Sequence, residues 1–441
     1  MYLKNGIKAN QTAIWVRSMQ KKNFSIKGFV VWGVSAIFFL YEFFLRTVIG
    51  TFQHPITESL NISSFEFSFL STTVFLIFYG AMQFPTSIIA TKIGLKKTLT
   101  AGCAICAVTC LGFAFSNDFY TALTFRMFMG LGSSVGFICL LIAAHEWMPK
   151  RHNALFIGLS QFIGTMGPML AAGPLHSAIE TTNLDWRSLF TTLSIIGLVI
   201  TVLIFFFVEN NKEKAGKFII LKKPQKTVDS IVSLFSRPAP WCIALFSAGL
   251  YFAIEYLTEN EGRPFLMLKG VSASFASYMI TLSWISFAFS CPLLGFLSDF
   301  TQKRKPIMVM AAVCACFAII LIIFGKEKYQ IFLGFFLLGV GASGQSIGFS
   351  IIAEHFKKDS IAIGFGLNNC MMILMSGISA PAISLLLDHT KGSSSSLTLE
   401  HYYFAFSPII AMIFFALILS IFFIKETYAK SRVEFTYIGV T

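Results

Sequence analysis

Long apolar segments separated by short polar stretches fill most of the chain. They cover residues 28–50, 66–90, 98–115, 119–144, 154–176 and 187–208, followed by 241–259, 273–298, 306–324, 329–353, 361–387 and 402–424. An α-helix of about 20 residues crosses the hydrocarbon core of a bilayer. The pattern therefore predicts an all-α membrane protein with twelve transmembrane helices.

The longest polar stretch between apolar segments divides the chain into six helices plus six. We expect a basic N-terminal tail, a first six-helix half, a central loop, a second half and a C-terminal tail at 1–27, 28–208, 209–240, 241–424 and 425–441. Of the 34 Lys and Arg residues, 26 fall on the side of the tails and the central loop, and six on the other. Because positive residues stay in the cytoplasm, we expect both termini to be cytoplasmic, in a multi-pass protein of a cell inner membrane.

The composition excludes several classes of protein. Hydrophobic residues make up 55% of the 441 residues and charged residues 12%, too apolar a mixture for a soluble globular protein. The net charge of +13 follows from the loop topology and does not indicate a nucleic-acid partner. The nine cysteines lie almost entirely in apolar segments, and no metal-ligand cluster or nucleophile–base set accompanies them. We therefore expect neither an enzyme nor a cofactor or metal.

Short motifs recur between the two halves. FMGLGSSVGF, residues 128–137, returns as LLGVGASGQ at 337–345, and FPTSIIATKIGLKKTL, residues 84–99, returns as CPLLGFLSDFTQKRKPI at 291–307. Two copies of one six-helix unit are the simplest account, and such parallel repeats are common in transporters. His145-Glu146 and Glu354-His355 also correspond, at the cytoplasmic ends of helices 4 and 10, where we expect a solvated gate pair rather than a metal site.

Charged residues inside the apolar segments are the first indication of function. Glu42 and Arg46 lie four residues apart on one helix face, and Arg126 lies within the fourth apolar segment. A charge in hydrocarbon costs several kcal/mol, so these side chains must face protein or water. They form either a structural pair that neutralises itself or a binding or proton-handling site inside the bundle.

These motifs resemble the major facilitator superfamily over essentially the whole chain. The family's loop between helices 2 and 3, G-x-L-x-D-R-x-G-R-K, matches here with Thr91 in place of the aspartate, whereas the second copy keeps Asp299. The resemblance implies the major facilitator fold, with two pseudo-symmetric halves. It also implies that the two loops latch the closed cytoplasmic face, Asp299 more firmly than Thr91. The gating residues expected on this basis are Lys92, Gly94, Lys96, Gly295, Asp299 and Arg304.

Within the superfamily, the YEFFLRT segment is most similar to the organic anion and organic phosphate branches. Those branches place one arginine in helix 1, matched by Arg46, and another in helix 7, where this chain has Glu255. The pseudo-twofold symmetry predicts that Arg46 and Glu255 lie at similar depth across a central cavity. A site with both signs of charge suits a zwitterion, or a proton carried by a carboxyl group that ionises in only one state. Alternatively, Glu255 only holds the halves together by pairing with Arg46 or Arg126.

The sequence thus predicts a proton-coupled transporter that imports a small polar metabolite, an amino acid or a small organic anion, by alternating access. Arg46 would bind the anionic group, Glu255 a cation or the proton, Glu42 would tune Arg46, and Arg126 would support the cavity wall. The expected hydrogen-bonding walls are Tyr41, Tyr251, Gln161, Gln345 and Asn368. The expected partners are the substrate, protons and the bilayer, with a monomer as the default. The alternatives are an organic phosphate or anion antiporter, an efflux pump for drugs or metabolites, and a sensor that has kept the fold without transport.

Overall fold

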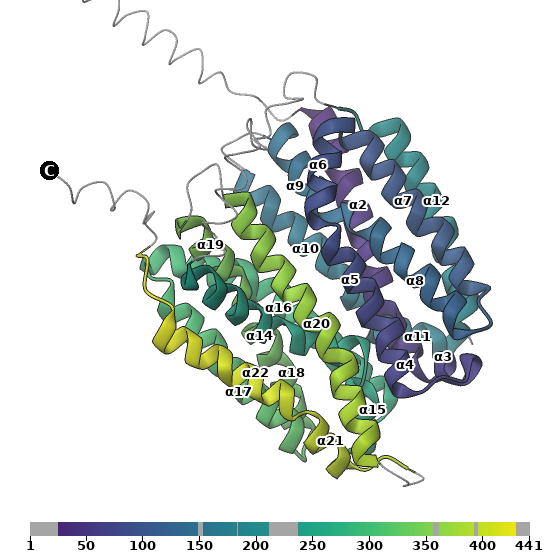
Figure 1. Cartoon of the computed structure of the whole chain (residues 1–441), viewed down its shortest axis with the longest axis vertical. Coiled ribbons are helices and arrows are strands. Elements are labelled where there is room, and N and C mark those ends of the chain that lie inside the picture. Colours follow the sequence, from purple (N-terminus) through teal and green to yellow (C-terminus); the bar gives the residue numbers. More distant parts are fainter. Residues whose placement is uncertain are drawn as a thin grey trace, which may run out of the picture.

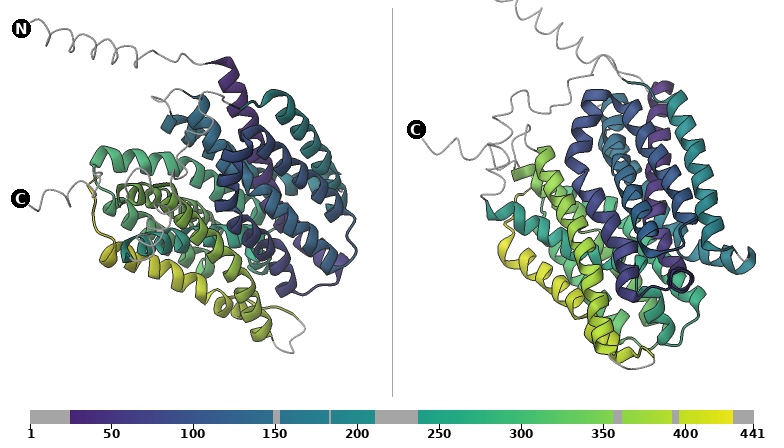
Figure 2. Two further views of the ribbon diagram at one scale, coloured as in Figure 1. Left: turned by 45° about the horizontal axis from the view of Figure 1, so that its top comes forward. Right: turned by 45° about the vertical axis from the view of Figure 1, so that its right-hand side comes forward.

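The computed structural model describes residues 25–148, 153–182, 184–210, 237–355, 361–391 and 396–428. All secondary structure in these ranges is helical, and the helices form two groups that lie side by side (Figures 1 and 2). The tails before residue 25 and after residue 428, and the central loop from 211 to 236, lie outside the described residues. The expectations made for them are therefore not addressed by the structure.

The first half contains six transmembrane helices, several of them interrupted. Helix 1 continues through a 3-10 stretch, helix 2 through a π-helical stretch, and helices 1, 2, 4 and 5 each consist of more than one α-helix. In chain order the elements are α2 (Ile26–Thr47), η1 (Val48–Phe52), α3 (Gln53–Leu60), α4 (Ser64–Ser68), η2 (Phe69–Thr73), α5 (Val74–Ala81), α6 (Gln83–Ile93), α7 (Leu95–Ala114), α8 (Phe119–Ser133), α9 (Val135–Trp147), α10 (Asn153–Ala171), α11 (Gly173–Thr182) and α12 (Trp186–Phe207).

The second half repeats this plan. Its elements are α14 (Pro238–Glu259), α15 (Gly262–Leu268), α16 (Ala273–Thr301), α17 (Lys305–Phe324), α18 (Lys328–Ala342), α19 (Gln345–His355), α20 (Ile361–Lys391), α21 (Leu399–Ala405), α22 (Ser407–Ile418) and η5 (Leu419–Phe423). Eleven helical spans among the described residues are long and apolar enough to cross a membrane. The pair α10 and α11 supplies the remaining transmembrane helix, so the predicted twelve-helix architecture is confirmed.

Side-chain caps fix where several helices begin. Asp118 accepts a hydrogen bond from the Thr121 backbone N–H at 2.9 Å, and Asp185 accepts one from the Ser188 N–H at the same distance. These N–H bonds lower the pKa of each aspartate, because they favour its ionised form. Ser63 and Glu66 form a reciprocal capping box at the start of α4. Each capping residue therefore lies where the chain leaves a loop and begins the next helix of the bundle.

The halves meet along helices that are not neighbours in sequence. Helix α10 packs against α16, and α5 packs against α20. We call the end of the bundle where α2 and α14 begin proximal, and the opposite end distal. In the distal part, Thr73 donates to the Gly377 carbonyl at 2.6 Å, and the Ser68 and Ser384 hydroxyls are hydrogen-bonded to each other. Side chains of the two halves thus interlock on the distal side of the bundle.

A glycine permits a close approach of backbones between the halves. A Cβ atom added to Gly50, in η1, would lie only 2.8 Å from the Cα atom of Glu259, at the end of α14. No larger residue fits there without moving one of the two backbones. Helix 1 and helix 7 are therefore held in contact beside the charged residues of the bundle.

Candidate functional site

Arg46 and Glu255 form an ion pair that joins the two halves in the interior of the bundle. Arg46 lies in the last turn of α2, and its Nη2 atom pairs with Oε1 of Glu255, in α14. The Arg46 residue is 5% exposed and Glu255 is fully buried. The structure therefore brings together the two residues that the sequence places at similar depth. Because water is almost excluded, each charge depends on its protein partners for stabilisation.

Glu259 is a second carboxylate on the same guanidinium. Its Oε1 lies 3.6 Å from Nε of Arg46, and its Oε2 accepts a hydrogen bond from the Thr72 hydroxyl at 3.0 Å. Sequence reasoning missed this residue, although it is one helical turn beyond Glu255 and ends the same apolar segment. That i, i+4 spacing places both carboxylates on one face and was the signal available. One arginine of the first half is thus shared by two acids of the second.

Aromatic rings surround the shared arginine. The guanidinium carbon of Arg46 lies 5.1 Å from the centroid of the Phe43 ring and 5.8 Å from that of Tyr79. Tyr251, one turn before Glu255 on α14, is buried against Trp284 and Phe287. Rings at these distances attract a cation through their faces and limit access of water. The planar edge of the Arg46 guanidinium remains available to carboxylates.

Arg126, also buried, serves a different set of partners. Its Nη1 donates to the Leu45 carbonyl at 2.7 Å, and its Nη2 donates to the carbonyls of Arg46 and Ser71 at 2.8 and 2.9 Å. These carbonyls lie where α2 ends and where helix 2 is π-helical, so the regular helical hydrogen bonds are interrupted there. Arg126 therefore fixes the backbone that carries Arg46, a position compatible with the wall role expected for it.

Glu42 lies one turn before Arg46 but does not form an ion pair with it among the described contacts. The residue is 1% exposed, and its Oε2 has no hydrogen-bond partner. Its side chain runs along Gly136 in α9, where an added Cβ would lie 2.9 Å from Cγ of Glu42. The two carboxylates of the opposite half take the guanidinium instead. The intrahelical pair suggested by the spacing is not made in this structure.

The polar side chains expected as walls of the site divide into those near it and those away from it. Tyr41 points away, because its hydroxyl donates to the Leu193 carbonyl at 2.8 Å inside the first half. Gln161 is half-buried on α10. Gln345 and Asn368 are buried in the second half, each with a side-chain oxygen that has no hydrogen-bond partner. Only Tyr251 accompanies Glu255 on its helix.

The first predicted gating loop is fastened to the end of helix 6. The Lys96 N–H donates to Oδ1 of Asn210 at 3.0 Å, and the Lys96 ammonium lies 4.8 Å from the centroid of the Phe205 ring. Gly94 has a φ of +93°, and an added Cβ would meet the Asn210 side chain at 2.6 Å, so glycine is required there. The side chain of Lys92 lies outside the described residues.

The second predicted gating loop carries a network of charges. Arg304 donates to Asp299 at 2.6 Å and to Glu354 at 2.9 Å. All three residues belong to the second half, so the described contacts of Asp299 lie within that half. A Cβ added to Gly295 would meet nothing within 4 Å. Glu354, expected to be part of a solvated gate pair, is instead a partner of Arg304, and its counterpart His145 has a side chain outside the described residues.

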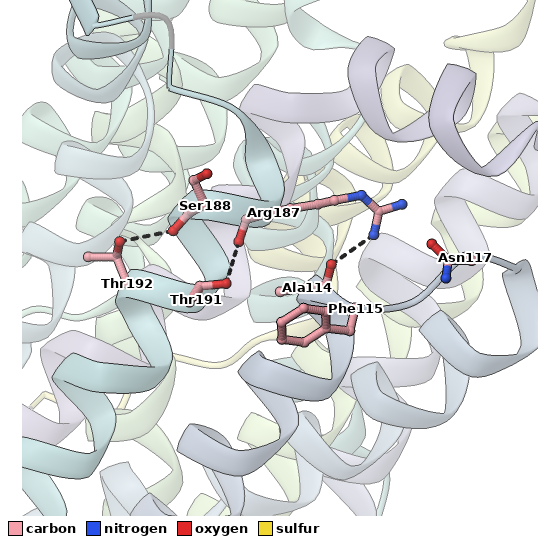
Figure 3. Close-up of a pocket in the computed structure, with 7 residues that line it drawn as sticks. All are labelled: Ala114, Phe115, Asn117, Arg187, Ser188, Thr191 and Thr192. Carbon is pink, nitrogen blue, oxygen red and sulfur yellow. Dashed lines mark hydrogen bonds between the residues drawn. The ribbon is translucent and has the colours of Figure 1, made fainter.

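A depression of about 480 Å³ opens elsewhere, between the distal ends of α7 and α12 (Figure 3). Arg187 lies on its wall, but the guanidinium donates to the carbonyls of Ala114 and Ser116, both at 2.7 Å. The hydroxyls of Thr191 and Thr192 donate to helix carbonyls. The guanidinium of Arg187 is paired within the first half, whereas the cluster at Arg46 joins the two halves, so the cluster is the better candidate for the functional site.

Two six-helix halves that meet around a buried charge cluster are an arrangement typical of secondary transporters of membranes. The model of the Major Facilitator Superfamily matches residues 34–325 and 263–436. The chain belongs to this family, as its motifs suggested.

Relatives agree with this assignment, and solved structures share the fold. The hexuronate transporter of Bacillus subtilis (strain 168) is 22% identical over 264 residues, which are 56% of this chain and 59% of that protein. The multidrug resistance protein MdtL of Escherichia coli O157:H7 is 22% identical over 358 residues, 75% of this chain and 88% of that protein. The inward-facing, unoccupied structure of a bacterial homolog to the human lysosomal transporter Spinster superposes with a TM-score of 0.72. At 16% identity, with 94% of this chain and 99% of that chain covered, this last likeness shows the fold alone.

Proposed function

We propose that the chain is a proton-coupled importer of a small organic anion and that Arg46 binds the anionic group. The observation that carries the proposal is the ion pair of Arg46 with Glu255, buried between halves that must separate in alternating access. A planar guanidinium holds a carboxylate or sulfonate through two parallel hydrogen bonds. An entering anion would therefore compete with Glu255 for the partner that Glu255 now has.

A proton gives the anion access to Arg46. Ionised Glu255 occupies the guanidinium, and at low dielectric its attraction is too strong for a neutral solute to displace. Protonation of Glu255 removes that attraction and leaves Arg46 to the carboxylate of the substrate. One proton entering with one monoanion keeps the net charge of the cluster unchanged. The arrangement therefore favours symport of the two over entry of the anion alone.

The charge of the site selects the class of cargo. A buried arginine with two acids suits a polar, charged solute better than an apolar drug, and the hexuronate transporter is named for an anionic sugar. Glu255 stands where the organic phosphate branches have a second arginine, which disfavours a phosphate dianion. An amino acid is the second candidate, because Glu259 lies 3.6 Å from the same guanidinium and would accept an ammonium group.

The orientation of the protein in the membrane follows from the charge of the loops. Because Lys and Arg residues concentrate on the side of the two tails, we place the proximal end in the cytoplasm of a cell whose inner membrane holds the protein. The interlocked distal part then faces outward.

Uptake into proteoliposomes tests the proposal. With an inward proton gradient, labelled D-glucuronate should accumulate above equilibrium in vesicles with the natural protein, whereas D-glucose should not. Glu255→Gln should exchange glucuronate across the membrane but no longer accumulate it, because the proton site is gone. Glu58→Gln removes an acid whose side chain is 70% exposed and should behave like the natural protein. Full accumulation by Glu255→Gln would contradict the coupling role, and accumulation of glycine in place of glucuronate would select the second candidate.

A further inference from the structure

We propose that Glu259 is a positioning residue that links anion binding at Arg46 to the seal between the halves on the distal side. The inference rests on the proposed function, because it names what happens when an anion takes Arg46. When the halves are in contact on the distal side, one carboxylate oxygen of Glu259 pairs with Arg46 and the other accepts a hydrogen bond from Thr72. An anion that binds Arg46 replaces the first of these two contacts. The loaded protein therefore opens its distal seal more readily than the empty one.

The distal seal is built from consecutive residues at the end of α14. Ser71 donates to Oδ1 of Asn260 at 2.8 Å, and Nδ2 of Asn260 donates to the Thr72 hydroxyl at 2.8 Å. The same Thr72 hydroxyl donates to Glu259 at 3.0 Å. Ser71 and Thr72 belong to η2 in the first half, whose π-helical turn places neighbouring hydroxyls against the second half. Glu259 and Asn260 thus both contact the Thr72 hydroxyl across the interface.

The next residues extend the seal. Gln53 donates to Oε1 of Glu261 at 2.7 Å, and Tyr402 donates to its Oε2 at 2.6 Å. Arg263 donates to the Thr51 carbonyl at 2.8 Å and contacts Nδ1 of His176 at 3.2 Å. Helix α14 ends at Glu259, and the backbone of the next residue, Asn260, leaves the helical region with φ of −132° and ψ of −115°. This break lets three consecutive polar side chains turn into the interface, where all are at most 2% exposed.

Among the described contacts of these seal residues, only those of Glu259 include Arg46. Glu255 and Glu259 lie one turn apart, so a single guanidinium reaches both, and a change at either carboxylate alters the attraction felt by the other. Glu261 has no such link: its described side-chain partners are Gln53 and Tyr402. The two acids are therefore a matched pair, equal in charge and burial but different in their connection to the site.

A disulfide across the seal can report its closure. The hydroxyls of Ser68 and Ser384 are hydrogen-bonded to each other from opposite halves, and Ser→Cys changes one atom in each. The yield of the disulfide in the full-length Ser68→Cys, Ser384→Cys protein, read by mass after alkylation of the free thiols, measures the sealed fraction. No ligand is needed for this measurement.

The first experiment is a double-mutant cycle on this reporter without ligand. Glu259→Gln should lower the disulfide yield, and the size of its effect should differ about twofold or more between the natural and Glu255→Gln backgrounds, because both acids act on Arg46. Glu261→Gln should have the same effect in both backgrounds. Equal effects of Glu259→Gln in both backgrounds would overturn the proposal. If Glu259→Gln does not fold, Glu259→Asp, which shortens the reach to Arg46, enters the cycle in its place.

The second experiment adds D-glucuronate, with D-glucose as the neutral control. Glucuronate should lower the disulfide yield of the reporter about twofold or more and should have no effect in the Glu259→Gln reporter, while the Glu261→Gln reporter still responds. A response that persists in Glu259→Gln would overturn the link. Absence of any thermal stabilisation by glucuronate would instead count against the proposed substrate class, and the ligand-free cycle would still decide the role of Glu259.

Discussion

The surroundings of Arg126 and of Arg46 differ in the kind of partner that each buried guanidinium has. Arg126 donates to three backbone carbonyls of its own half, at 2.7, 2.8 and 2.9 Å. Arg46 pairs with two carboxylates of the other half, Glu255 and Glu259. Backbone carbonyls neither titrate nor leave, whereas a carboxylate can take a proton or move away with its half.

Under the proposed function, the two arginines have different roles at a similar depth in the bundle, support of the backbone for Arg126 and anion binding for Arg46. Arg126 binds the carbonyl of Arg46 itself, so the fixed arginine holds the backbone of the exchangeable one. A functional charge in a membrane needs such a rigid second layer, because its own partners must change during the cycle. Burial alone, which both arginines share, does not distinguish the two roles.

Removal of the fixed arginine should have the largest effect. Arg126→Gln leaves buried carbonyls of Leu45, Arg46 and Ser71 without their donor, and it should lower the free energy of unfolding by about 3 kcal/mol or more. Unfolding in mixed micelles measures this loss. The matched control is Arg187→Gln, which removes the donor to the carbonyls of Ala114 and Ser116 at a partly exposed site where water can replace it, so its loss should be smaller. A stability close to that of the natural protein would show that the carbonyls find other donors and that the comparison is wrong.

Conservative replacement of the exchangeable arginine should have a smaller effect, on binding rather than stability. Arg46→Lys keeps the charge but not the planar fork, so the affinity for D-glucuronate should fall about tenfold, or about 1.4 kcal/mol. Titration calorimetry on the purified protein measures the change, and the melting temperature without ligand serves as its control. An unchanged affinity would argue against a two-point contact with the anion.

The sequence predicts the fold because the fold depends on patterns that are regular along the chain. The apolar segments, the basic loops and the repeated motifs give twelve helices and two halves without any knowledge of contacts. The same symmetry brings Arg46 and Glu255 to one level, where the structure has them paired. Periodicity was sufficient for these features.

The remaining parts of the site depend on irregular backbone that the sequence pattern does not encode. The contacts of Ser71 and Thr72 require a π-helical turn, and those of Asn260 require the end of α14. Tyr41 faces its own half. Glu42 lies on the same helix face as Arg46 but does not pair with it, because the carboxylates of the other half compete for the guanidinium. Helix position can be counted from sequence, but the choice among competing partners depends on packing between the halves.

The distinction between fixed and exchangeable partners extends to two acids outside the membrane spans and gives the smallest predicted effect. Although partial burial opposes it, backbone N–H groups of Arg304, Lys305, Thr427 and Tyr428 lower the pKa of Glu426. Burial raises the pKa of Glu261, only partly offset by its bonds from Tyr402 and Gln53. Glu426 therefore stabilises the fold above its ordinary pKa and loses that contribution as the pH falls through the lowered value. Ionised Glu261 carries a penalty that disappears as the pH falls.

Melting temperatures of Glu426→Gln and Glu261→Gln, each compared with the natural protein from about pH 7.5 down to about pH 4, test these signs. At the higher pH, Glu426→Gln should melt about 1 to 2 °C lower and Glu261→Gln at the same temperature or slightly higher. Both differences in melting temperature from the natural protein should shrink as the pH falls, the negative one of Glu426→Gln and the zero or positive one of Glu261→Gln. Two variants that shift in the same direction at pH 7.5 would mean that Glu261 is held as firmly as Glu426. The distal seal would then belong with the fixed part of the molecule, together with Arg126, and not with Arg46.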